Sequence, residues 1–179
     1  MKLVILDRDG VINFDSDQYI KSPSEWRPLP GSIEAIARLY QSGFRVAVAT
    51  NQSGIGRGLF DMATLNAIND KMMEMVFRQG GRIDALFFCP HTADENCNCR
   101  KPRTGMLEEI AARFHTELKG VPAIGDSLRD LQAAESVGAQ PILVLTGKGK
   151  VTEEQGGMPR KTLVFEDLAE ASRHLIAHA

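Results

Sequence analysis

The chain has 179 residues, of which 43% are hydrophobic and 25% are charged, and its formal net charge is −2. This length and composition suit one folded globular domain and exclude a second large domain. A slightly acidic chain has no general attraction for nucleic acid or anionic membranes, and no apolar run approaches the roughly 20 residues of a membrane-spanning helix. The N-terminus turns acidic too early for a signal peptide, so we expect a cytoplasmic protein, monomeric and without nucleic-acid or membrane partners.

Short apolar runs alternate with amphipathic stretches along the whole chain. Strands are expected within residues 3–6, 45–49, 85–88, 121–124 and 142–145, with a weaker one at 163–165. Helices are expected at 32–41, 61–79, 106–118, 128–137 and 167–177. Continuous rather than alternating apolarity favours parallel strands that are covered on both faces. The repeated strand–helix pattern predicts an α/β fold, a doubly wound and mainly parallel sheet, in one domain spanning residues 1–179.

Polar residues follow four of the predicted strands. In a parallel sheet, ligands bind beyond the carboxyl ends of the strands. Carboxylates, small hydroxyl or amide donors and cations gathered at that edge are the groups that bind a phosphoryl group together with a divalent metal. The residues in question are Asp7, Asp9, Thr50, Asn51, Gln52, Ser53, Arg100, Lys101 and Asp126.

The aspartates suggest a magnesium site. At an extended strand end, Asp7 and Asp9 project to the same side, where two carboxylates need a cation or a proton between them. The alternative is a solvated turn in which Asp9 caps its own loop. Asp126 is interpreted as a metal ligand and Asp130 as a partner of Lys101 or of metal-bound water, although either aspartate could instead serve the helix dipole.

The donors and cations fit a phosphoryl group. The Thr50 hydroxyl can donate to a phosphoryl oxygen, and residues 51–53 can contact phosphate or substrate. Lys101 offers a compact charge and Arg100 a planar fork of donors. The alternatives are an ordinary polar exit from the second strand and a basic loop that precedes a helix.

The three cysteines fall within one short segment, residues 89–99, and an odd number suits a disulfide framework poorly. With one histidine they form two pairs of ligands at i, i+2 spacing, which suits a closed tetrahedral Zn²⁺ site. Because the protein fills all four positions, the zinc would order the loop rather than do chemistry. The alternative is three free thiols and a surface histidine. The ligands are Cys89, His91, Cys97 and Cys99.

Together these motifs resemble the haloacid dehalogenase superfamily of phosphatases, especially its zinc-containing branch of heptose-bisphosphate and histidinol-phosphate phosphatases. The resemblance implies a Rossmann-like core in which Asp7 is the nucleophile that forms an aspartyl-phosphate. Asp9 would be the general acid and base, and Thr50 and Lys101 would hold the phosphoryl oxygens. Mg²⁺ would bind the Asp7 and Asp126 carboxylates and the Asp9 carbonyl.

Residues 50–58 and 100–106 look most like the heptose-bisphosphate enzymes of this branch. They imply removal of the 7-phosphate of D-glycero-D-manno-heptose 1,7-bisphosphate, in nucleotide-activated heptose biosynthesis for lipopolysaccharide core or a related glycan. Residues 93–95 look more like histidinol-phosphate phosphatases, so that substrate is the alternative. A polynucleotide 3′-phosphatase and a zinc-loop binding module on an inactive scaffold are remoter. Expected substrate contacts are Arg8, Asp15, Tyr19, Asn51, Gln52, Ser53, Arg100 and Ser127.

No cap domain is expected, because a loop, a helix and a strand already fill the stretch between Asp7 and Thr50. Three loops would then shape the pocket: residues 14–30, residues 54–60 and the zinc loop. Tyr19 and Trp26 in the first loop either contact substrate or pack the loop onto the body.

Overall fold

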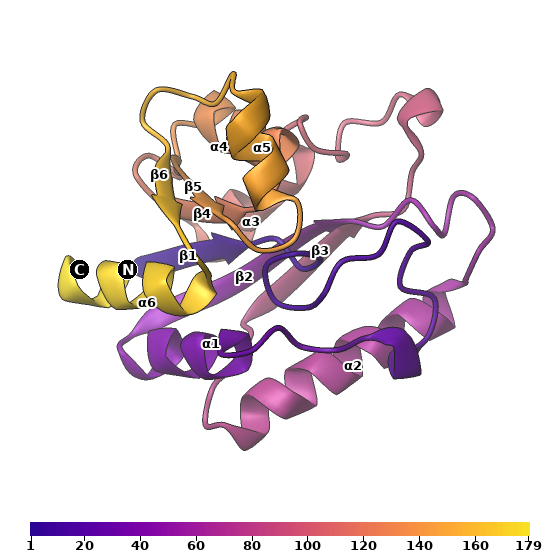
Figure 1. The fold of residues 1–179 in the computed structure, drawn as a ribbon, viewed down its shortest axis with the longest axis horizontal. Coiled ribbons are helices and arrows are strands. Elements are labelled where there is room, and N and C mark those ends of the chain that lie inside the picture. Colours follow the sequence, from indigo (N-terminus) through magenta and orange to yellow (C-terminus); the bar gives the residue numbers. More distant parts are fainter.

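Six parallel strands form one sheet in the order β3-β2-β1-β4-β5-β6 in the computed structural model, which describes residues 1–179 (Figure 1). This confirms the predicted doubly wound parallel sheet. The strands are β1 (Lys2–Leu6), β2 (Phe44–Asn51), β3 (Ala85–Cys89), β4 (Pro122–Gly125), β5 (Gln140–Val144) and β6 (Leu163–Phe165).

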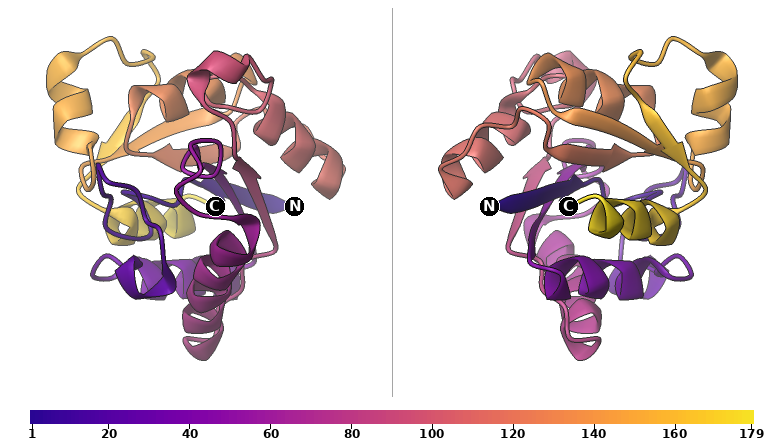
Figure 2. Two further views of the ribbon diagram at one scale, coloured as in Figure 1. Left: turned by 90° about the vertical axis from the view of Figure 1, so that its right-hand side faces the viewer. Right: turned by 90° about the vertical axis from the view of Figure 1, so that its left-hand side faces the viewer.

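Helices cover both faces of the sheet (Figures 1 and 2). One face carries α1 (Ser32–Gln41), α2 (Met62–Arg78) and α6 (Leu168–Ala177), and the other carries α3 (Gly105–Phe114) and α4 (Leu128–Ser136). A further short helix, α5 (Gly149–Gln155), follows β5, and two 3₁₀ turns lie at Pro23–Glu25 and Ala93–Glu95. None of these helices has the length and apolar character needed to cross a membrane.

The central strand shows why its sequence is apolar without alternation. Val4 and Leu6 are buried in the core on the α1, α2 and α6 side, whereas Leu3 and Ile5 are buried against α3 and α4. A strand covered on both faces needs apolar residues at every position. The two cores therefore hold β1 rigidly and fix the place where its carboxyl end emerges.

Most predicted elements agree with the structure to within two residues, and the larger differences concern two helices. Helix α3 ends at Phe114 rather than 118, because His115 adopts a left-handed conformation (φ 50°) that closes the helix. Leu118 lies beyond that turn but packs into the core, which is why the apolar pattern in the sequence extends to residue 118. Helix α5 is absent from the prediction, since its seven residues are mostly polar and offer no apolar stripe.

The loop after β1 is fastened to α2 rather than left free. Trp26 is fully buried, and the Lys71 ammonium donates to the carbonyls of Pro23 and Trp26 at 2.7 Å. Trp26 therefore packs the loop onto the body, whereas Tyr19 lines the cleft described below. The same loop thus anchors at one end and reaches the carboxyl edge of the sheet at the other.

Candidate active site and metal centre

The carboxyl ends of β1, β2 and β4 and the loop after β3 open into one cleft of about 260 Å³ with an almost entirely polar lining. These strands flank the point where the strand order reverses, which is where ligands bind in such sheets. The structure brings together there nearly all of the residues that the sequence singled out. They are Asp7, Asp9, Asp15, Tyr19, Thr50, Asn51, Gln52, Ser53, Arg100, Lys101, Asp126, Ser127 and Asp130.

Three carboxylates meet on the floor of the cleft. Oxygens of Asp7, Asp126 and Asp130 lie within 4.8 Å of one another. Burial, with the Asp130 charge next in weight, raises the pKa of Asp7 to about 7. Burial and then the Asp7 charge raise the pKa of Asp126 to about 8. Carboxylates this close resist ionisation together, so the donor set fits a hard divalent cation such as Mg²⁺.

Two glycines keep this floor open. A Cβ on Gly10 would lie 2.0 Å from Asp126 Oδ2, and one on Gly147 would lie 2.3 Å from the same oxygen. Gly10 also has a φ of +85°, which other residues rarely adopt. The backbone N–H of Lys148 donates to that oxygen at 2.8 Å and fixes the carboxylate. Asp126 is thus held in place by close backbone approach.

Lys101 stands among the carboxylates as the only buried ammonium. Its Nζ lies 2.6 Å from Asp130 Oδ1 and 3.0 Å from Asp7 Oδ1, and it donates to the Ala49 carbonyl at 2.8 Å. Burial alone would lower the pKa of Lys101, but the Asp130 and Asp7 carboxylates raise it above its usual range. Burial likewise opposes ionisation of Asp130, yet the Lys101 ammonium lowers the pKa of that carboxyl. Lys101 is therefore a permanent cation at the cleft floor.

Asn51 and Ser127, which the sequence predicts to contact substrate, use their side chains in hydrogen bonds within the protein. Asn51 accepts from the Lys101 backbone N–H at 3.0 Å and donates to the Lys101 carbonyl at 3.2 Å. Ser127 caps α4, and its hydroxyl donates to Asp130 at 2.9 Å. Both residues line the cleft, and both fix the partners of the buried ion pair.

The Asp9 carboxylate is held from several sides. Asn13 donates to Oδ1 at 2.9 Å and Gln52 donates to Oδ2 at 3.0 Å. Arg8 Nε donates to Oδ1 at 3.0 Å. The expectation that Arg8 contacts substrate is wrong: its side chain is 0% exposed, lies outside the cleft lining, and packs beneath it against Asn69 of α2.

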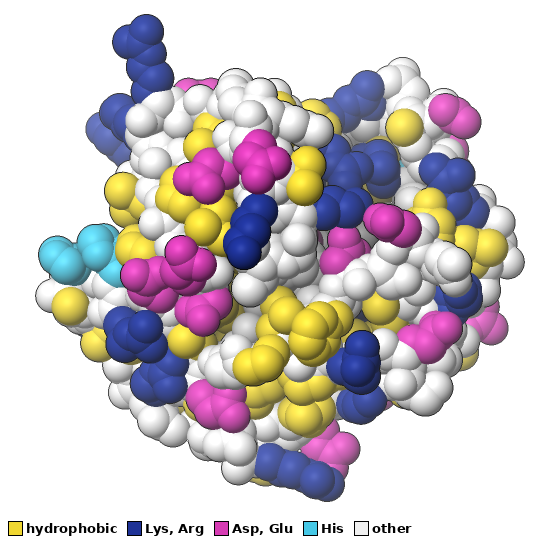
Figure 3. Space-filling view, viewed as in Figure 1, with side chains coloured by type: hydrophobic (Ala, Val, Ile, Leu, Met, Phe, Trp, Pro, Cys, Tyr) yellow, Lys and Arg dark blue, Asp and Glu magenta, His cyan; other side chains and the backbone are white.

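One wall of the cleft is cationic. Arg57, Arg100 and Arg129 line it, and none of them forms an ion pair with a carboxylate within 4.0 Å. Burial, followed by the Arg129 charge, lowers the pKa of Arg100. Figure 3 shows Lys and Arg side chains gathered beside the hollow, with acidic groups next to them. Unpaired guanidinium groups converging in a cleft form a site for an anion.

Two cleft residues lie outside the sequence prediction. Arg129 lies in the first turn of α4. Because it follows the end of the fourth strand closely, the sequence could have placed it at the same edge of the sheet as Asp126. Lys148 comes from the loop before α5 and lies 3.6 Å from Asp15 Oδ2. No motif marks it, because only the fold brings residues so distant in sequence together.

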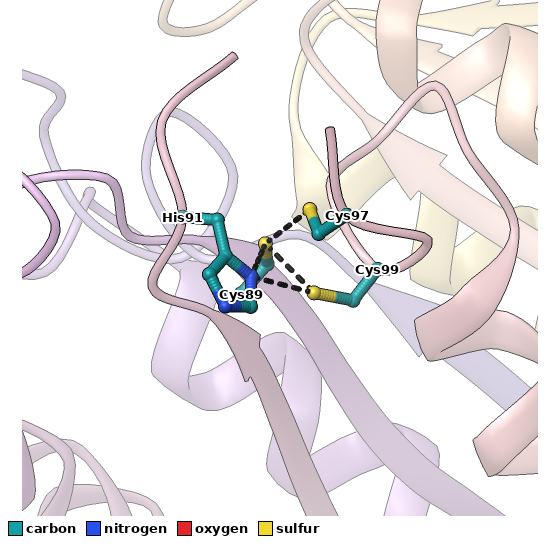
Figure 4. A group of neighbouring side chains, drawn as sticks. All are labelled: Cys89, His91, Cys97 and Cys99. Carbon is teal, nitrogen blue, oxygen red and sulfur yellow. Dashed lines mark hydrogen bonds between the residues drawn. The ribbon is translucent and has the colours of Figure 1, made fainter. Parts of the chain in front are cut away.

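The zinc ligands converge at the end of β3 (Figure 4). His91 Nδ1 lies 3.5 Å from Cys89 Sγ and 3.2 Å from Cys99 Sγ, and Cys89 Sγ lies 3.6 Å from Cys97 Sγ and 2.9 Å from Cys99 Sγ. Tetrahedral zinc with Zn–S bonds near 2.3 Å places its ligand atoms about 3.7 Å apart. The quartet confirms the predicted cluster, and its donor set fits Zn²⁺.

A contact of one zinc-loop thiol, that of Cys97, connects the zinc loop to the cleft. Burial raises the pKa of the Cys89 thiol. Burial opposes ionisation of Cys97 as well, but the backbone N–H of Arg100, 3.4 Å from its sulfur, and further hydrogen bonds lower its pKa to about 6. This contact links the cluster directly to the cationic wall.

The chain is similar to known phosphatases along its whole length. The family described as polynucleotide kinase 3 phosphatase matches residues 2–128, and the family described as HAD-hydrolase-like matches residues 98–171. The chain is 58% identical, over all of both chains, to D-glycero-beta-D-manno-heptose-1,7-bisphosphate 7-phosphatase from Bordetella bronchiseptica. It is 56% identical to the enzyme of that name from Pseudomonas putida, over 98% of this chain and all of the relative.

The chain is also similar to solved structures over nearly its whole length. The D,D-heptose 1,7-bisphosphate phosphatase from B. bronchiseptica, complexed with magnesium and phosphate, superposes over all of both chains with a TM-score of 0.99 and 58% identity. The enzyme from Burkholderia thailandensis gives 0.80 at 52% identity over 99% of each chain. The chain belongs to the D-glycero-beta-D-manno-heptose-1,7-bisphosphate 7-phosphatase family of the HAD-like hydrolases.

Proposed function

We propose that the protein is a Mg²⁺-dependent phosphomonoesterase that removes the 7-phosphate of D-glycero-β-D-manno-heptose 1,7-bisphosphate. The observation that carries this proposal is the division of one cleft into two anion sites. The floor joins three carboxylates with Lys101, which suits a phosphoryl group and a cation, and the wall offers three arginines without carboxylate partners. The names of the relatives and the magnesium and phosphate in the B. bronchiseptica structure support it.

The floor would bind the phosphoryl group that reacts. The carboxylates of Asp7 and Asp126, with the backbone carbonyl of Asp9, would hold Mg²⁺, which offsets negative charge on the phosphoryl oxygens when bound. Lys101 would bind the same oxygens, since its ammonium already lies 3.0 Å from Asp7 Oδ1. The Thr50 hydroxyl accepts a hydrogen bond from Gln52 at 2.9 Å and donates only a long one, 3.5 Å, to the Asn51 carbonyl, so it would donate to the phosphoryl group instead when substrate binds.

The first chemical step transfers the phosphoryl group to Asp7. A carboxylate oxygen of Asp7 forms a bond to phosphorus while the bond between phosphorus and the sugar oxygen breaks. The electron pair of that bond stays on the sugar oxygen, which takes a proton from Asp9 and leaves as the alcohol.

The second step releases phosphate. The Asp9 carboxylate removes a proton from water, whose oxygen bonds to phosphorus as the aspartyl-phosphate bond breaks. Asp7 recovers its carboxylate and Asp9 is protonated again, so the site returns to its starting state. Both steps require Asp7 and Asp9 to be held in place around the phosphorus, because phosphoryl transfer depends mainly on positioning and charge neutralisation.

The cationic wall would bind the phosphate that remains on the sugar. Arg57 lies over the Tyr19 ring, 5.8 Å from its centroid, so the loop that contains Tyr19 borders this wall. Asp15 and Tyr19 line the cleft where sugar hydroxyls would lie. The alternative substrate, histidinol phosphate, has one phosphate and carries an ammonium group, which unpaired arginines repel.

The remaining expectations form part of the same proposal. Residues 1–179 would act as one capless domain, with the zinc loop, residues 89–99, ordering the start of the Arg100–Lys101 segment. A monomer without nucleic-acid or membrane partners fits a small-molecule cleft. The reduced thiols that a zinc site requires fit a cytoplasmic location.

Substrate comparison tests this proposal. Phosphate release is measured under Mg²⁺ with the β and α anomers of heptose 1,7-bisphosphate, histidinol phosphate and a 3′-phosphorylated oligonucleotide. We expect kcat/KM to be highest for the β-bisphosphate, by at least about tenfold over histidinol phosphate, which corresponds to one ion-pair contact of about 1.4 kcal/mol. A preference for histidinol phosphate or for the oligonucleotide would overturn the substrate assignment.

A further inference from the structure

Arg8 is one of three charged residues that are buried as whole residues, and the only one of them that does not line the cleft. Lys101 and Asp126, the other buried charged residues, both do. The Arg8 side chain is 0% exposed, and the chemistry above assigns it no part. A guanidinium removed from water is costly unless its charge and donors are satisfied, so its partners indicate why it is there.

The guanidinium has two partners. Its Nε and Nη2 both lie 3.0 Å from Asp9 Oδ1, and its Nη1 donates to Asn69 Oδ1 at 3.1 Å. Asn69 belongs to α2 and is itself buried. Arg8 therefore connects the Asp9 carboxylate to a helix of the scaffold.

The contacts on Asp9 come from two parts of the chain, the loop after β1 and the loop after β2. Arg8 and Asn13 both contact Oδ1, whereas Gln52, from the loop after β2, contacts Oδ2. The Asp9 side chain keeps 22% of its surface exposed, and it lines the cleft. Both oxygens of the carboxyl group are thus held by the protein, while the exposed part of the side chain faces the place where substrate would bind.

We propose that Arg8, anchored by Asn69, is a positioning residue that aims the Asp9 carboxyl at the leaving oxygen. This inference rests on the proposed function, in which Asp9 protonates that oxygen as its bond to phosphorus breaks. The carboxylate left after proton transfer stays paired with the guanidinium 3.0 Å away. Placement of a proton donor within hydrogen-bond reach of the leaving atom governs how well it works.

The shape of the side chain matters as well as its charge. A guanidinium reaches Asp9 and Asn69 at once through a planar fork. In Arg8→Lys the charge is kept but one ammonium replaces two directed contacts, so part of the function should return. In Arg8→Gln the positive charge is lost, and the shorter side chain no longer bridges Asp9 and Asn69.

A leaving-group series separates positioning from simple loss of structure. Substituted phenyl phosphates, from 4-nitrophenyl to unsubstituted phenyl phosphate, have similar sizes but leaving oxygens of increasing basicity. The quantity measured is kcat/KM, which reports only the steps through loss of the phenol. A leaving oxygen of low basicity needs little help from a proton donor, and a basic one needs much.

We expect Arg8→Gln to lower kcat/KM about 100-fold for phenyl phosphate and less than about fivefold for 4-nitrophenyl phosphate. Arg8→Lys should fall between Arg8→Gln and the parent, and Asn69→Ala should show a smaller change of the same kind. The control is Arg45→Gln, which removes an arginine from another 3.0 Å ion pair, with Asp84, outside the cleft. It should leave the whole series unchanged.

A double variant tests whether Arg8 acts through Asp9. In the Asp9→Asn background, Arg8→Gln should cost less than about twofold further, because the group it positions is gone. An equal loss across all phenyl phosphates, or a full additional loss in the double variant, would overturn the inference. If Arg8→Gln does not fold, Asn69→Ala and Arg8→Lys test the inference through the same dependence of kcat/KM on leaving-group basicity. Turnover retained by Asp7→Asn would instead overturn the proposed function itself.

Discussion

Lys101 and Asp130 form a buried ion pair with 2.6 Å between Nζ and Oδ1, at the point where the floor of the cleft meets α4. The same ammonium lies 3.0 Å from Asp7, so Asp130 determines where the positive charge stands relative to the proposed nucleophile. Asp130→Asn should leave Lys101 buried with one carboxylate partner fewer. We expect kcat to fall about 10- to 100-fold with KM changed less, as measured by steady-state phosphate release.

The proposed nucleophile gives a sharper prediction. Asp7→Asn keeps the size of the side chain but removes the attacking oxygen charge, and we expect kcat to fall about 10⁴-fold or more. Asp70→Asn, an exposed aspartate of α2, is the matched control and should keep parental kcat. Substantial turnover by pure Asp7→Asn would remove this residue from the nucleophile role.

Gly10 offers a test of the cleft floor. In Gly10→Ala the new Cβ would meet Asp126 Oδ2 at 2.0 Å, in addition to the strain of a φ of +85°. Gly43→Ala has a similar φ of +89° but no atom within 4 Å of the new Cβ. Gly43→Ala should lose about 1 kcal/mol of stability in thermal or urea unfolding, from the backbone strain alone. Gly10→Ala should lose more, and only this variant should also lose Mg²⁺ affinity and turnover. Equal activity losses would contradict this account of the floor.

The raised pKa values of Asp7 and Asp126 predict a pH-dependent response to Mg²⁺. In the metal-free protein these carboxyls bind protons more tightly folded than unfolded, so their contribution to stability is full below pH about 3.8 and is lost as pH rises through 7 to 8. Mg²⁺ replaces those protons. The rise in Tm on adding 5 mM MgCl₂ should therefore be larger at pH 8 than at pH 5.5, roughly twofold or more. A rise that is independent of pH would count against a cation among these carboxylates.

The zinc quartet predicts a bound metal with a structural effect. Protein purified without chelators should contain about one zinc per chain by elemental analysis. Cys99→Ser should lose zinc and lower Tm by about 10 °C, because a structural zinc contributes directly to folding. Ser136→Ala, in a surface position of α4, is a control that should alter neither quantity. Zinc-free protein with parental Tm and activity would contradict the structural role.

The cationic wall predicts a selective loss of affinity. Arg129→Gln should raise KM for heptose 1,7-bisphosphate about tenfold or more and leave KM for a sugar monophosphate nearly unchanged, since only the bisphosphate occupies both anion sites. Arg113→Gln, exposed on α3, is the matched control. Equal changes for both substrates would mean that Arg129 does not contact the second phosphate.

Much of this architecture follows from local patterns in the sequence. The apolar run at residues 3–6 predicts a strand buried on both faces, and the parallel topology then places Asp7, Thr50 and Asp126 at one edge. The zinc quartet follows from the chemistry of its four side chains and their paired spacing. These inferences succeed because strand periodicity and ligand identity are properties of neighbouring residues.

Other features depend on the three-dimensional fold. Lys148 reaches the cleft only through the path of the chain after β5, which no local pattern encodes. Arg8 is different, because the rule that sends Asp7 and Asp9 to one side of an extended segment also sends Arg8 to the other. Applied to all three residues, that rule predicts the buried position that the structure shows.

Hydrolysis at C7 can be followed by ³¹P NMR of the product formed from heptose 1,7-bisphosphate with enzyme and Mg²⁺. We expect one equivalent of inorganic phosphate and a sugar that keeps only the phosphate on C1. A sugar that keeps the phosphate on C7, or a bisphosphate that stays unchanged, would contradict hydrolysis at C7.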